Sequence, residues 1–160
     1  MSILIGRRPR RTAVRVAVLV VVSVVVFRWV LIPIRAQGVS MQPTYEPGTF
    51  HLVSRLAFAR RDPGRGDVVA IRLAGPGVLY VKRIIGLPGE RVRIRDGRVF
   101  VDDAPLDEPY VRHRNSSWSL PETALGADEY FVVGDNRGMP IGQHELGKAH
   151  RARIVGAVVF

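Results

Sequence analysis

The hydrophobic and polar positions divide the chain into one long apolar run and a series of short alternating segments. The run from Val16 to Ile34 holds 19 residues and is interrupted only by Ser23, Arg28 and Pro33. As a helix rising about 1.5 Å per residue it would measure ~28 Å, close to the hydrocarbon thickness of a bilayer. Its many valines would favour a strand in a short segment, but its length favours a membrane helix. We therefore predict a transmembrane anchor over residues 16–35 that follows a basic tail over residues 1–15.

Arginines gather on the N-terminal side of this run and predict its orientation. By the positive-inside rule, the arginines before Val16 place the N-terminus in the cytoplasm. Everything after Arg35 is then expected on the outer side of the cell membrane, in a single-pass protein. A cleaved signal peptide is the alternative, because it also has a charged region and an apolar core. The length of the run and the poor cleavage site formed by Pro33, Ile34 and Arg35 favour the anchor.

After the anchor, residues 36–160 have the pattern of one β-rich domain. Asp96-Gly97 stands between two alternating segments, which is the signal of a two-residue hairpin. The segment from Asp102 to Ala127 is rich in Asp, Pro, Ser and Gly and is interpreted as a surface excursion. Helix is expected only in the anchor and in one turn near Gln143 to Lys148. Strands are expected over Val68–Leu73, Val78–Ile85, Arg91–Arg95, Arg98–Val101, Tyr130–Val133 and Ile154–Phe160. The expected fold is mostly β, a small antiparallel barrel or sandwich preceded by one N-terminal transmembrane helix.

The charge distribution excludes a nucleic-acid-binding protein. The net charge is +10, but the first seven basic residues, Arg7 to Arg35, come before any acidic residue. From Ala36 onward 17 basic and 14 acidic residues nearly balance, whereas a nucleic-acid-binding domain would itself carry the basic stripe. Because the chain has no cysteine, it can form neither a disulfide nor a thiolate metal site. Its four histidines show no metal-ligand spacing, so we expect neither a metal nor another cofactor.

Ser40 and Lys82 are the candidates for chemistry. A serine hydroxyl is a weak nucleophile until a nearby base takes its proton. A lysine can be that base only when it is neutral, which burial favours by lowering its pKa. On a strand, Lys82 shares a face with Tyr80 and Ile84, so it would be drawn to the apolar side. Taken singly, Ser40 could be a turn serine beside Pro43 and Lys82 a solvated lysine on a strand.

Four blocks around these residues occur in order and with compatible spacing. The set resembles the type I signal peptidases, which are membrane-anchored serine proteases with a serine–lysine dyad. The resemblance implies that Ser40 is the nucleophile and Lys82 the general base, with the Ser40 backbone N–H stabilising the oxyanion. The blocks are Ser40-Met41-Gln42-Pro43-Thr44, Arg65-Gly66-Asp67-Val68-Val69, Tyr80-Val81-Lys82-Arg83-Ile84-Ile85-Gly86-Leu87-Pro88-Gly89 and Gly134-Asp135-Asn136-Arg137.

The resemblance also implies roles for residues around the dyad. Gly38 stands where some relatives have a serine that contributes a hydroxyl to the oxyanion hole, so only backbone donors are expected here. Gly38, Met41 and Tyr80 are expected to bind the oxyanion or the substrate. Asp67 and Asp135 each follow a glycine and are expected to shape turns. The residues expected to support the motifs are Asp67, Gly134, Asp135, Asn136 and Arg137.

The chain departs from the family pattern after Arg137. Typical members continue with a serine that orients the lysine and with an aspartate and an arginine that brace the loop. Here Pro140, Gly142 and His144 hold those three positions, and no serine or threonine follows Arg137. The chain is either an active, divergent member with another brace or a weakened, specialised enzyme, and the intact dyad blocks favour activity. His144 itself is interpreted as a polar loop histidine.

The position of Ser40 predicts the substrate class. It follows Arg35 by five residues, so its hydroxyl lies within ~17 Å of the end of the anchor. A protease held there reaches a peptide bond just outside the bilayer, where a signal peptide ends in small residues. The expected partners are membrane lipid and signal-peptide-bearing precursors, with the protein export machinery as a further candidate. The alternatives are a maturation protease for one secretion or pilus substrate and an anchored domain that binds exported peptides without cutting them.

Overall fold

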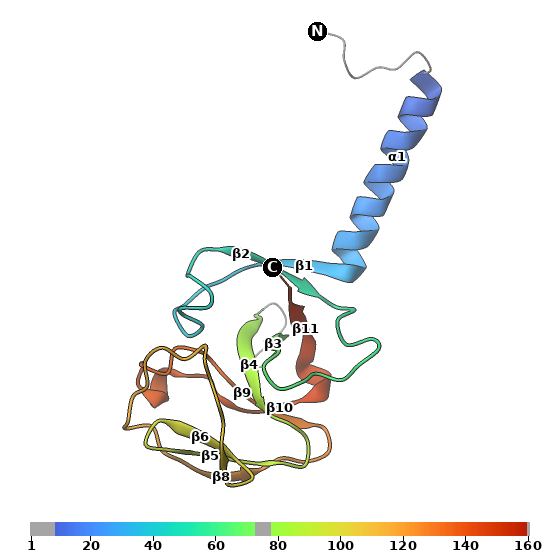
Figure 1. Cartoon of the computed structure of the whole chain (residues 1–160). Coiled ribbons are helices and arrows are strands. Elements are labelled where there is room, and N and C mark those ends of the chain that lie inside the picture. Colours follow the sequence, from blue (N-terminus) through green and yellow to red (C-terminus); the bar gives the residue numbers. More distant parts are fainter. Residues whose placement is uncertain (1–8, 73–77, 160) are drawn as a thin grey trace.

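The computed structural model describes residues 9–72 and 78–159 of the chain. Its first element is the helix α1 (Pro9–Val25), which continues into the π-helical turn η1 (Val26–Val30). Together they form a 22-residue apolar helix, long enough to cross a membrane by length and composition, with no part of it buried by the domain. It stands away from the β domain in Figure 1. The single apolar N-terminal helix of the sequence prediction is therefore confirmed.

The limits of this helix differ from the prediction. It is already helical at Pro9, ahead of the predicted start of the anchor at Val16. It ends at Val30, and the last five residues of the predicted anchor form the strand β1 (Leu31–Arg35) instead. Pro33 is tolerated in this strand because β1 lies at an edge of its sheet.

Two antiparallel sheets make up the rest of the described chain. The larger has seven strands in the order β1-β2-β11-β3-β4-β9-β10, and the smaller has four in the order β7-β6-β5-β8. The predicted antiparallel, mostly β class is therefore confirmed. Neither sheet closes into a barrel, so the barrel alternative is wrong. Besides β1, the larger sheet consists of β2 (Phe50–Ser54), β11 (Ile154–Val158), β3 (Val68–Ile71), β4 (Tyr80–Gly86), β9 (Glu129–Val133) and β10 (Gly147–His150). The smaller sheet consists of β7 (Ala104–Pro105), β6 (Arg98–Val101), β5 (Arg91–Arg95) and β8 (Leu120–Ala124), and short 3-10 turns lie at η2 (Ile141–Gln143) and η3 (Arg151–Arg153).

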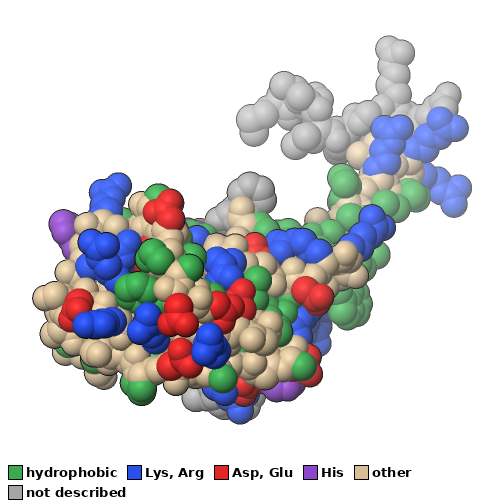
Figure 2. Space-filling model, turned by 60° about the horizontal axis from the view of Figure 1, so that its bottom comes forward, with side chains coloured by type: hydrophobic (Ala, Val, Ile, Leu, Met, Phe, Trp, Pro, Cys, Tyr) green, Lys and Arg blue, Asp and Glu red, His purple; other side chains and the backbone are tan. Residues whose placement is uncertain are grey.

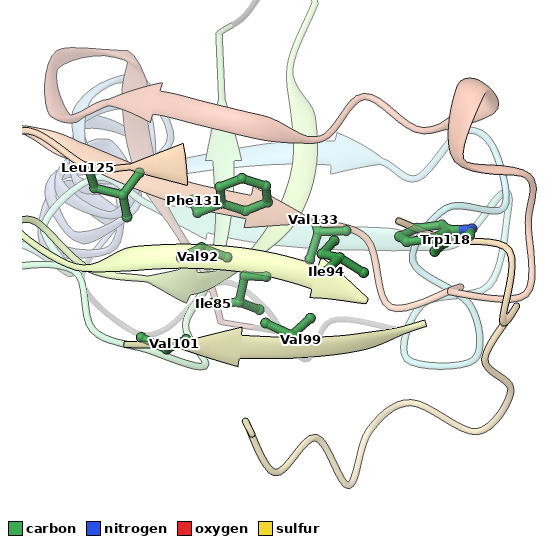
Figure 3. Close-up of a cluster of buried hydrophobic side chains, with 9 residues drawn as sticks. All are labelled: Ile85, Val92, Ile94, Val99, Val101, Trp118, Leu125, Phe131 and Val133. Carbon is green, nitrogen blue, oxygen red and sulfur yellow. The ribbon is translucent and has the colours of Figure 1, made fainter. Parts of the chain in front are cut away.

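The main hydrophobic core lies where the smaller sheet packs against β4 and β9 (Figure 3). Alternate residues of each strand enter it, because successive side chains of a strand point to opposite faces. Arginines occupy the intervening positions of β5, so its other face meets solvent. The core side chains are Ile85, Val92, Ile94, Val99, Val101, Trp118, Leu125, Phe131 and Val133.

A second core covers the opposite face of the larger sheet. Ile84 of β4 and Val132 of β9 belong to it, next to Ile85 and Val133 of the first core. The central strands β4 and β9 are therefore buried on both faces, so local unfolding there would expose both cores. Lys82 lies on β4, two residues before Ile84, so its backbone is held by this centre.

The comparison with the predicted elements is mixed. The strands expected at 68–73, 78–85, 91–95, 98–101, 130–133 and 154–160 are all present with shifted ends, and the Asp96-Gly97 hairpin is confirmed. Both turn residues have positive φ, at 50° and 74°, as a type I′ turn requires. The surface excursion at 102–127 is wrong in part, because it contains β7, β8 and the buried side chains of Glu108 and Trp118. The turn expected near Gln143 to Lys148 is at η2, and β10 follows it. Residues 1–8, Leu73 and Phe160 lie outside the described residues.

Basic and acidic side chains are interspersed over the face of the domain in Figure 2. Arg91, for example, lies within 3.7 Å of carboxylate oxygens of Asp102, Asp103 and Glu122. This face carries no continuous basic stripe, in agreement with the near balance of charge after Ala36. It gives no support to nucleic-acid binding.

Candidate active site

Ser40 lies in the turn-rich segment between β1 and β2. Gly38 has a φ of +80°, a conformation that glycine adopts without strain, and it redirects the chain out of β1. The turn then tightens through hydrogen bonds from the Gln42 N–H to the Val39 carbonyl (3.1 Å) and from the Tyr45 N–H to the Met41 carbonyl (3.0 Å). Met41 is buried and fixes the segment to the domain, while Ser40 stays half-buried. The hydroxyl is thus held at the surface of a cleft by a fixed backbone.

Lys82 approaches Ser40 from the middle of β4. Its Nζ lies 3.2 Å from the Ser40 Oγ, and the residue is only 1% exposed. The prediction that Lys82 turns inward with Ile84 is therefore confirmed. Burial lowers the pKa of the Lys82 ammonium below its ordinary value, because the interior disfavours the charged form. An amine with a lowered pKa beside a hydroxyl is what proton abstraction from serine requires.

A carboxylate also reaches Lys82. The Glu145 Oε2 lies 3.4 Å from Nζ, and the Glu145 side chain is 52% exposed at the rim of the cleft. Its negative charge opposes the effect of burial and raises the pKa of Lys82. The sequence analysis missed Glu145, because a single acidic residue in a loop gives no signal of what it contacts.

The Gly134-Asp135-Asn136 segment holds the backbone around Ser40. The Asn136 N–H donates to the Ser40 carbonyl, and the Asn136 side-chain amide donates to the Val39 carbonyl, both at 3.0 Å. Gly134 packs so closely that a Cβ there would overlap the Ser40 carbonyl oxygen and lie 2.8 Å from the His144 Cε1. Only glycine fits at this position, so the segment acts as a template for the nucleophile turn.

Asp135 joins the nucleophile turn to the strand that carries Lys82. It accepts hydrogen bonds from Arg83 Nε (2.8 Å) and Nη2 (2.6 Å), and the Thr44 hydroxyl donates to it at 2.5 Å. Arg83 also donates to the Gly66 carbonyl at 2.8 Å, and it lies 4.0 Å over the ring of Tyr110. Asp135 was expected to shape a turn and to support the motifs, and the structure places it as a link between the Ser40 and Lys82 segments.

A buried ion pair between Arg137 and Glu108 supports the segment that begins at Gly134. Arg137 donates to the Gly134 carbonyl (2.8 Å) and, through both terminal nitrogens, to the Glu108 carboxylate (3.2 and 2.6 Å). Both side chains are at most 1% exposed, and Arg114 gives Glu108 a second cation at 3.2 Å. Glu108 escaped the sequence analysis because its Pro- and Asp-rich surroundings indicated a surface loop.

A cleft of about 750 Å³ passes in front of the dyad. Tyr80 and Met41, both expected at the substrate, line it with Ser40 and Lys82, and so does the exposed Gly38. Its walls come from residues 32–41, which follow the helix, from residues 78–82, and from Met139, Gln143 and Glu145. The cleft therefore begins directly at the end of the apolar helix.

Asp67 lies outside the cleft-lining residues. Its carboxylate accepts from the Gly64 N–H at 2.8 Å and pairs with Arg61 at 2.6 Å, which closes the turn before β3. The Arg61 side chain and this turn hold the pKa of Asp67 below its ordinary value, although partial burial opposes them. Asp67 supports the site through the backbone: its carbonyl accepts a hydrogen bond from the Ile84 N–H of β4 at 3.0 Å, and the carbonyl of the neighbouring Gly66 accepts one from Arg83.

Residues 10–160 match the family described as signal peptidase, peptidase S26. The chain belongs to this family. It is 31% identical over 152 residues to signal peptidase I V of Bacillus subtilis (strain 168), covering 87% of this chain and 90% of that protein. It is 34% identical over 128 residues to signal peptidase I of Leptolyngbya laminosa, covering 75% of this chain and 63% of that protein. The crystal structure of a signal peptidase I from Enterococcus faecalis V583 superposes with a TM-score of 0.51 at 26% identity, covering 62% of this chain and 98% of that one.

In the loop after Arg137, residues 138–146, His144 is the one buried residue. The interpretation of His144 as a polar loop histidine is wrong, because the residue is only 9% exposed and packs edge-on against Trp118 at 4.8 Å. Its Nε2 lies 2.7 Å from the Asn136 carbonyl, so the Nε2–H donates there. Among the residues that the structure describes, the other ring nitrogen, Nδ1, is buried and has no hydrogen-bond partner. His144 therefore stiffens the template residue Asn136, which in turn holds Ser40.

Burial also determines how His144 titrates. It lowers the pKa of the imidazole below the ordinary 6.5, with the nearby Lys82 and Arg137 charges acting in the same direction and the bond to Asn136 opposing them. As the pH falls, the imidazole of His144 therefore becomes protonated at a higher pH in the unfolded chain than in the folded chain. Stability contributed by neutral His144 is complete above pH 6.5 and is lost as the pH falls below it.

We expect His144→Gln to make the stability of the domain less sensitive to pH. Glutamine keeps an amide donor near the Asn136 carbonyl but cannot bind a proton, so the loss of stability below pH 6.5 should become smaller. The measurement is urea unfolding of both proteins at a series of pH values from 7.5 to about 5. His113→Gln is the control, because His113 is exposed. Identical pH slopes for wild type and His144→Gln would contradict this role.

Proposed function

We propose that this chain is a membrane-bound serine endopeptidase that removes N-terminal signal peptides from exported proteins, with Ser40 as nucleophile and Lys82 as general base. The observation that carries the proposal is the 3.2 Å contact between the Ser40 Oγ and the Nζ of the buried Lys82. Membership of the signal peptidase S26 family supports the reaction class, and the relatives at about 30% identity are named signal peptidase I.

The geometry supports a conventional acyl-transfer sequence. Neutral Lys82 takes the proton of the Ser40 hydroxyl while Oγ bonds to the scissile carbonyl carbon, which becomes a tetrahedral oxyanion. The intermediate collapses to an acyl-serine, and the Lys82 ammonium returns the proton to the departing amine. Water then attacks the ester while Lys82 accepts its proton, and the Lys82 ammonium returns that proton to the Ser40 Oγ as the signal peptide leaves with a free carboxylate. None of the described residues accepts a hydrogen bond from the Ser40 N–H, so this donor is available to the oxyanion.

The connection between helix and domain supports a site beside the bilayer. Val30, the last helical residue, accepts a hydrogen bond from the Arg55 N–H at 2.9 Å, and Leu31 then pairs with Ser54 in β2. The domain thus begins where the helix ends, with no spacer. With the N-terminal arginines in the cytoplasm, the cleft would open on the outer side of the membrane, close to emerging precursors.

The same connection favours a retained anchor over a cleaved signal peptide. Signal-peptide removal needs an accessible, extended segment after the apolar core. Here Leu31–Arg35, which follow the helix directly, are paired along their full length with β2. Cutting there would remove an edge strand and one wall of the cleft.

A precursor with a bulky residue immediately before the cut is expected to resist cleavage. Met41 and Tyr80 line the cleft beside Ser40, and a signal peptide carries small residues just before its cut, so alanine-sized side chains are expected to fit there. The test incubates the protein in lipid or detergent with an Ala-X-Ala precursor and with a variant carrying Phe at the last position, followed by sequencing of the new N-terminus. Cutting after the second alanine, with a loss of at least ~100-fold for Phe, is the expected result. Equal cleavage of both substrates would contradict the assignment.

A panel of precursors from the same membrane system separates the proposed general enzyme from its alternatives. A general signal peptidase cuts most precursors that carry small residues before the cleavage site. Cleavage of one precursor alone would instead indicate a dedicated maturation protease. Binding of the precursors without cleavage of any of them would indicate a non-catalytic binder.

A further inference from the structure

Two polar groups of the cleft lie within hydrogen-bonding reach of the Lys82 Nζ. The Nζ is 3.2 Å from the Ser40 Oγ and 3.4 Å from the Glu145 Oε2. We infer that Glu145 is a positioning residue that completes a Ser40–Lys82–Glu145 triad, orienting the base and stabilising its charge as the charge forms. This inference rests on the proposed function and assigns a role at the same site to a residue outside the four motif blocks.

The first part of the role is orientation. A neutral lysine amine has two hydrogens and one lone pair, and only the lone pair can accept the serine proton. An acceptor at Glu145 engages one N–H and so turns the lone pair toward the Ser40 Oγ. The arrangement follows the general pattern of nucleophile, base and a third group that orients the base.

The second part is electrostatic. When Ser40 transfers its proton, Lys82 becomes an ammonium in a buried environment that disfavours charge. A carboxylate 3.4 Å away is a fixed counter-charge for that ammonium and needs no rearrangement during the step. Glu145 keeps half its surface in solvent, so its own charge remains hydrated before the reaction.

The Glu145 carboxylate also shifts the titration of Lys82, and this shift can be measured. Its charge raises the pKa of Lys82 and thereby reduces the neutral fraction of the base at low pH. Among the described residues, Glu145 and His144 are the titratable groups whose charges interact with Lys82. His144 is held neutral by burial near pH 7, so Glu145 dominates.

The loop is built to hold Glu145 at this place. The preceding residue, His144, is fixed by its bond to Asn136 and by a hydrogen bond from its N–H to the Ile141 carbonyl at 3.0 Å. Two residues after Glu145, Gly147 enters β10 and pairs with Val132. Glu145 is therefore fixed from both sides although its side chain is exposed.

The kinetic test is the pH profile of kcat/KM for wild type and Glu145→Gln. Without the carboxylate, the pKa of Lys82 falls, so the acid limb of the profile should move to lower pH. On the alkaline plateau, where Lys82 is neutral in both proteins, the rate should fall about tenfold or more. Glu145→Asp should recover part of the plateau rate. Glu129→Gln removes the partner of the exposed Lys148 and is the matched control, with neither change expected.

The second test follows the base itself and does not depend on cleavage. The chain has only two lysines, Lys82 and Lys148, so full-length protein with isotope-labelled lysine in micelles gives two side-chain NMR signals. Lys82 should titrate below the ordinary value of a lysine in wild type, and Glu145→Gln should lower the Lys82 pKa further. Glu129→Gln, which removes the partner of Lys148, should leave the Lys82 titration unchanged.

The outcomes separate this inference from the proposed function. Wild type that cuts no precursor contradicts the proposed function, and the NMR titration then still decides whether Glu145 acts on Lys82. Active wild type with an unchanged profile in Glu145→Gln contradicts the triad while leaving the dyad in place. An acid limb that moves to lower pH in Glu145→Gln, with an unchanged rate on the plateau, would also contradict the triad. Glu145 would then raise the pKa of Lys82 without assisting the reaction.

Discussion

Replacing Lys82 by methionine is expected to abolish precursor cleavage while leaving the domain folded. The side chain is 1% exposed, and methionine offers a similar length and flexibility without the amine. Since an uncharged apolar chain is cheaper to bury than an amine, folding should not suffer. Without a base 3.2 Å from its hydroxyl, Ser40 is a poor nucleophile, and a loss of about 10²- to 10⁴-fold in kcat/KM is expected. Initial cleavage rates and circular dichroism provide the measurement.

Lys148→Met is the matched control for this substitution. Lys148 is the only other lysine in the chain and pairs with Glu129 on β9, with 42% of its side chain exposed. Its loss should leave cleavage within about twofold of wild type, because a surface ion pair contributes little. Retention of more than a tenth of the activity by folded Lys82→Met would show that another group serves as the base.

Gly134→Ala is expected to have the second-largest effect. A Cβ at this position would overlap the Ser40 carbonyl oxygen and press on the His144 ring, so the nucleophile turn must move. Such overpacking costs about 1–3 kcal/mol of stability. A displacement of ~1 Å at a reacting group lowers the rate on the order of 100-fold. Urea unfolding and cleavage rates of the same preparation measure both effects.

Gly142→Ala provides a control in the same loop. A Cβ at Gly142 meets no atom within 4 Å, and this glycine is not among those with positive φ. Its substitution should leave stability and cleavage near wild type. If Gly134→Ala is as active as Gly142→Ala, the Gly134-to-Asn136 segment is not the template for Ser40.

The inward orientation of Lys82 was predictable because it depends on a local rule. Side chains alternate along a strand, so Lys82 had to share a face with Ile84 once β4 was assigned, and Ile84 is fully buried. The Asp96-Gly97 hairpin was predictable for the same kind of reason, since two residues determine its turn. Local patterns of this sort do not depend on distant parts of the chain.

The end of the apolar helix was not predictable in this way. Leu31 to Ile34 continue the apolar run of the helical residues before them, so hydropathy alone continues the helix. These residues form a strand because they pair with Phe50–Ser54. That partner segment lies about 20 residues later in the chain and has no strong strand pattern of its own. Tertiary pairing overrides the local signal here.

Glu108, His144 and Glu145 were missed for a related reason. Each is polar and lies in a loop-like segment, where exposure is the ordinary expectation. Glu108 becomes buried because Arg137, 29 residues later, returns to it, and His144 because Trp118 covers it. No local sequence signal reports such long-range partners.

Acylation of Ser40 is the measurement that tests the central claim most directly. Wild type, Ser40→Ala and Lys82→Met would be treated in micelles with a peptide-based acylating inhibitor of serine hydrolases, and the adduct located by mass spectrometry. A single adduct on the peptide that contains Ser40 in wild type, absent from both variants, is the predicted result. An adduct on another residue, or equal labelling of Ser40 in wild type and Lys82→Met, would contradict a nucleophile activated by Lys82.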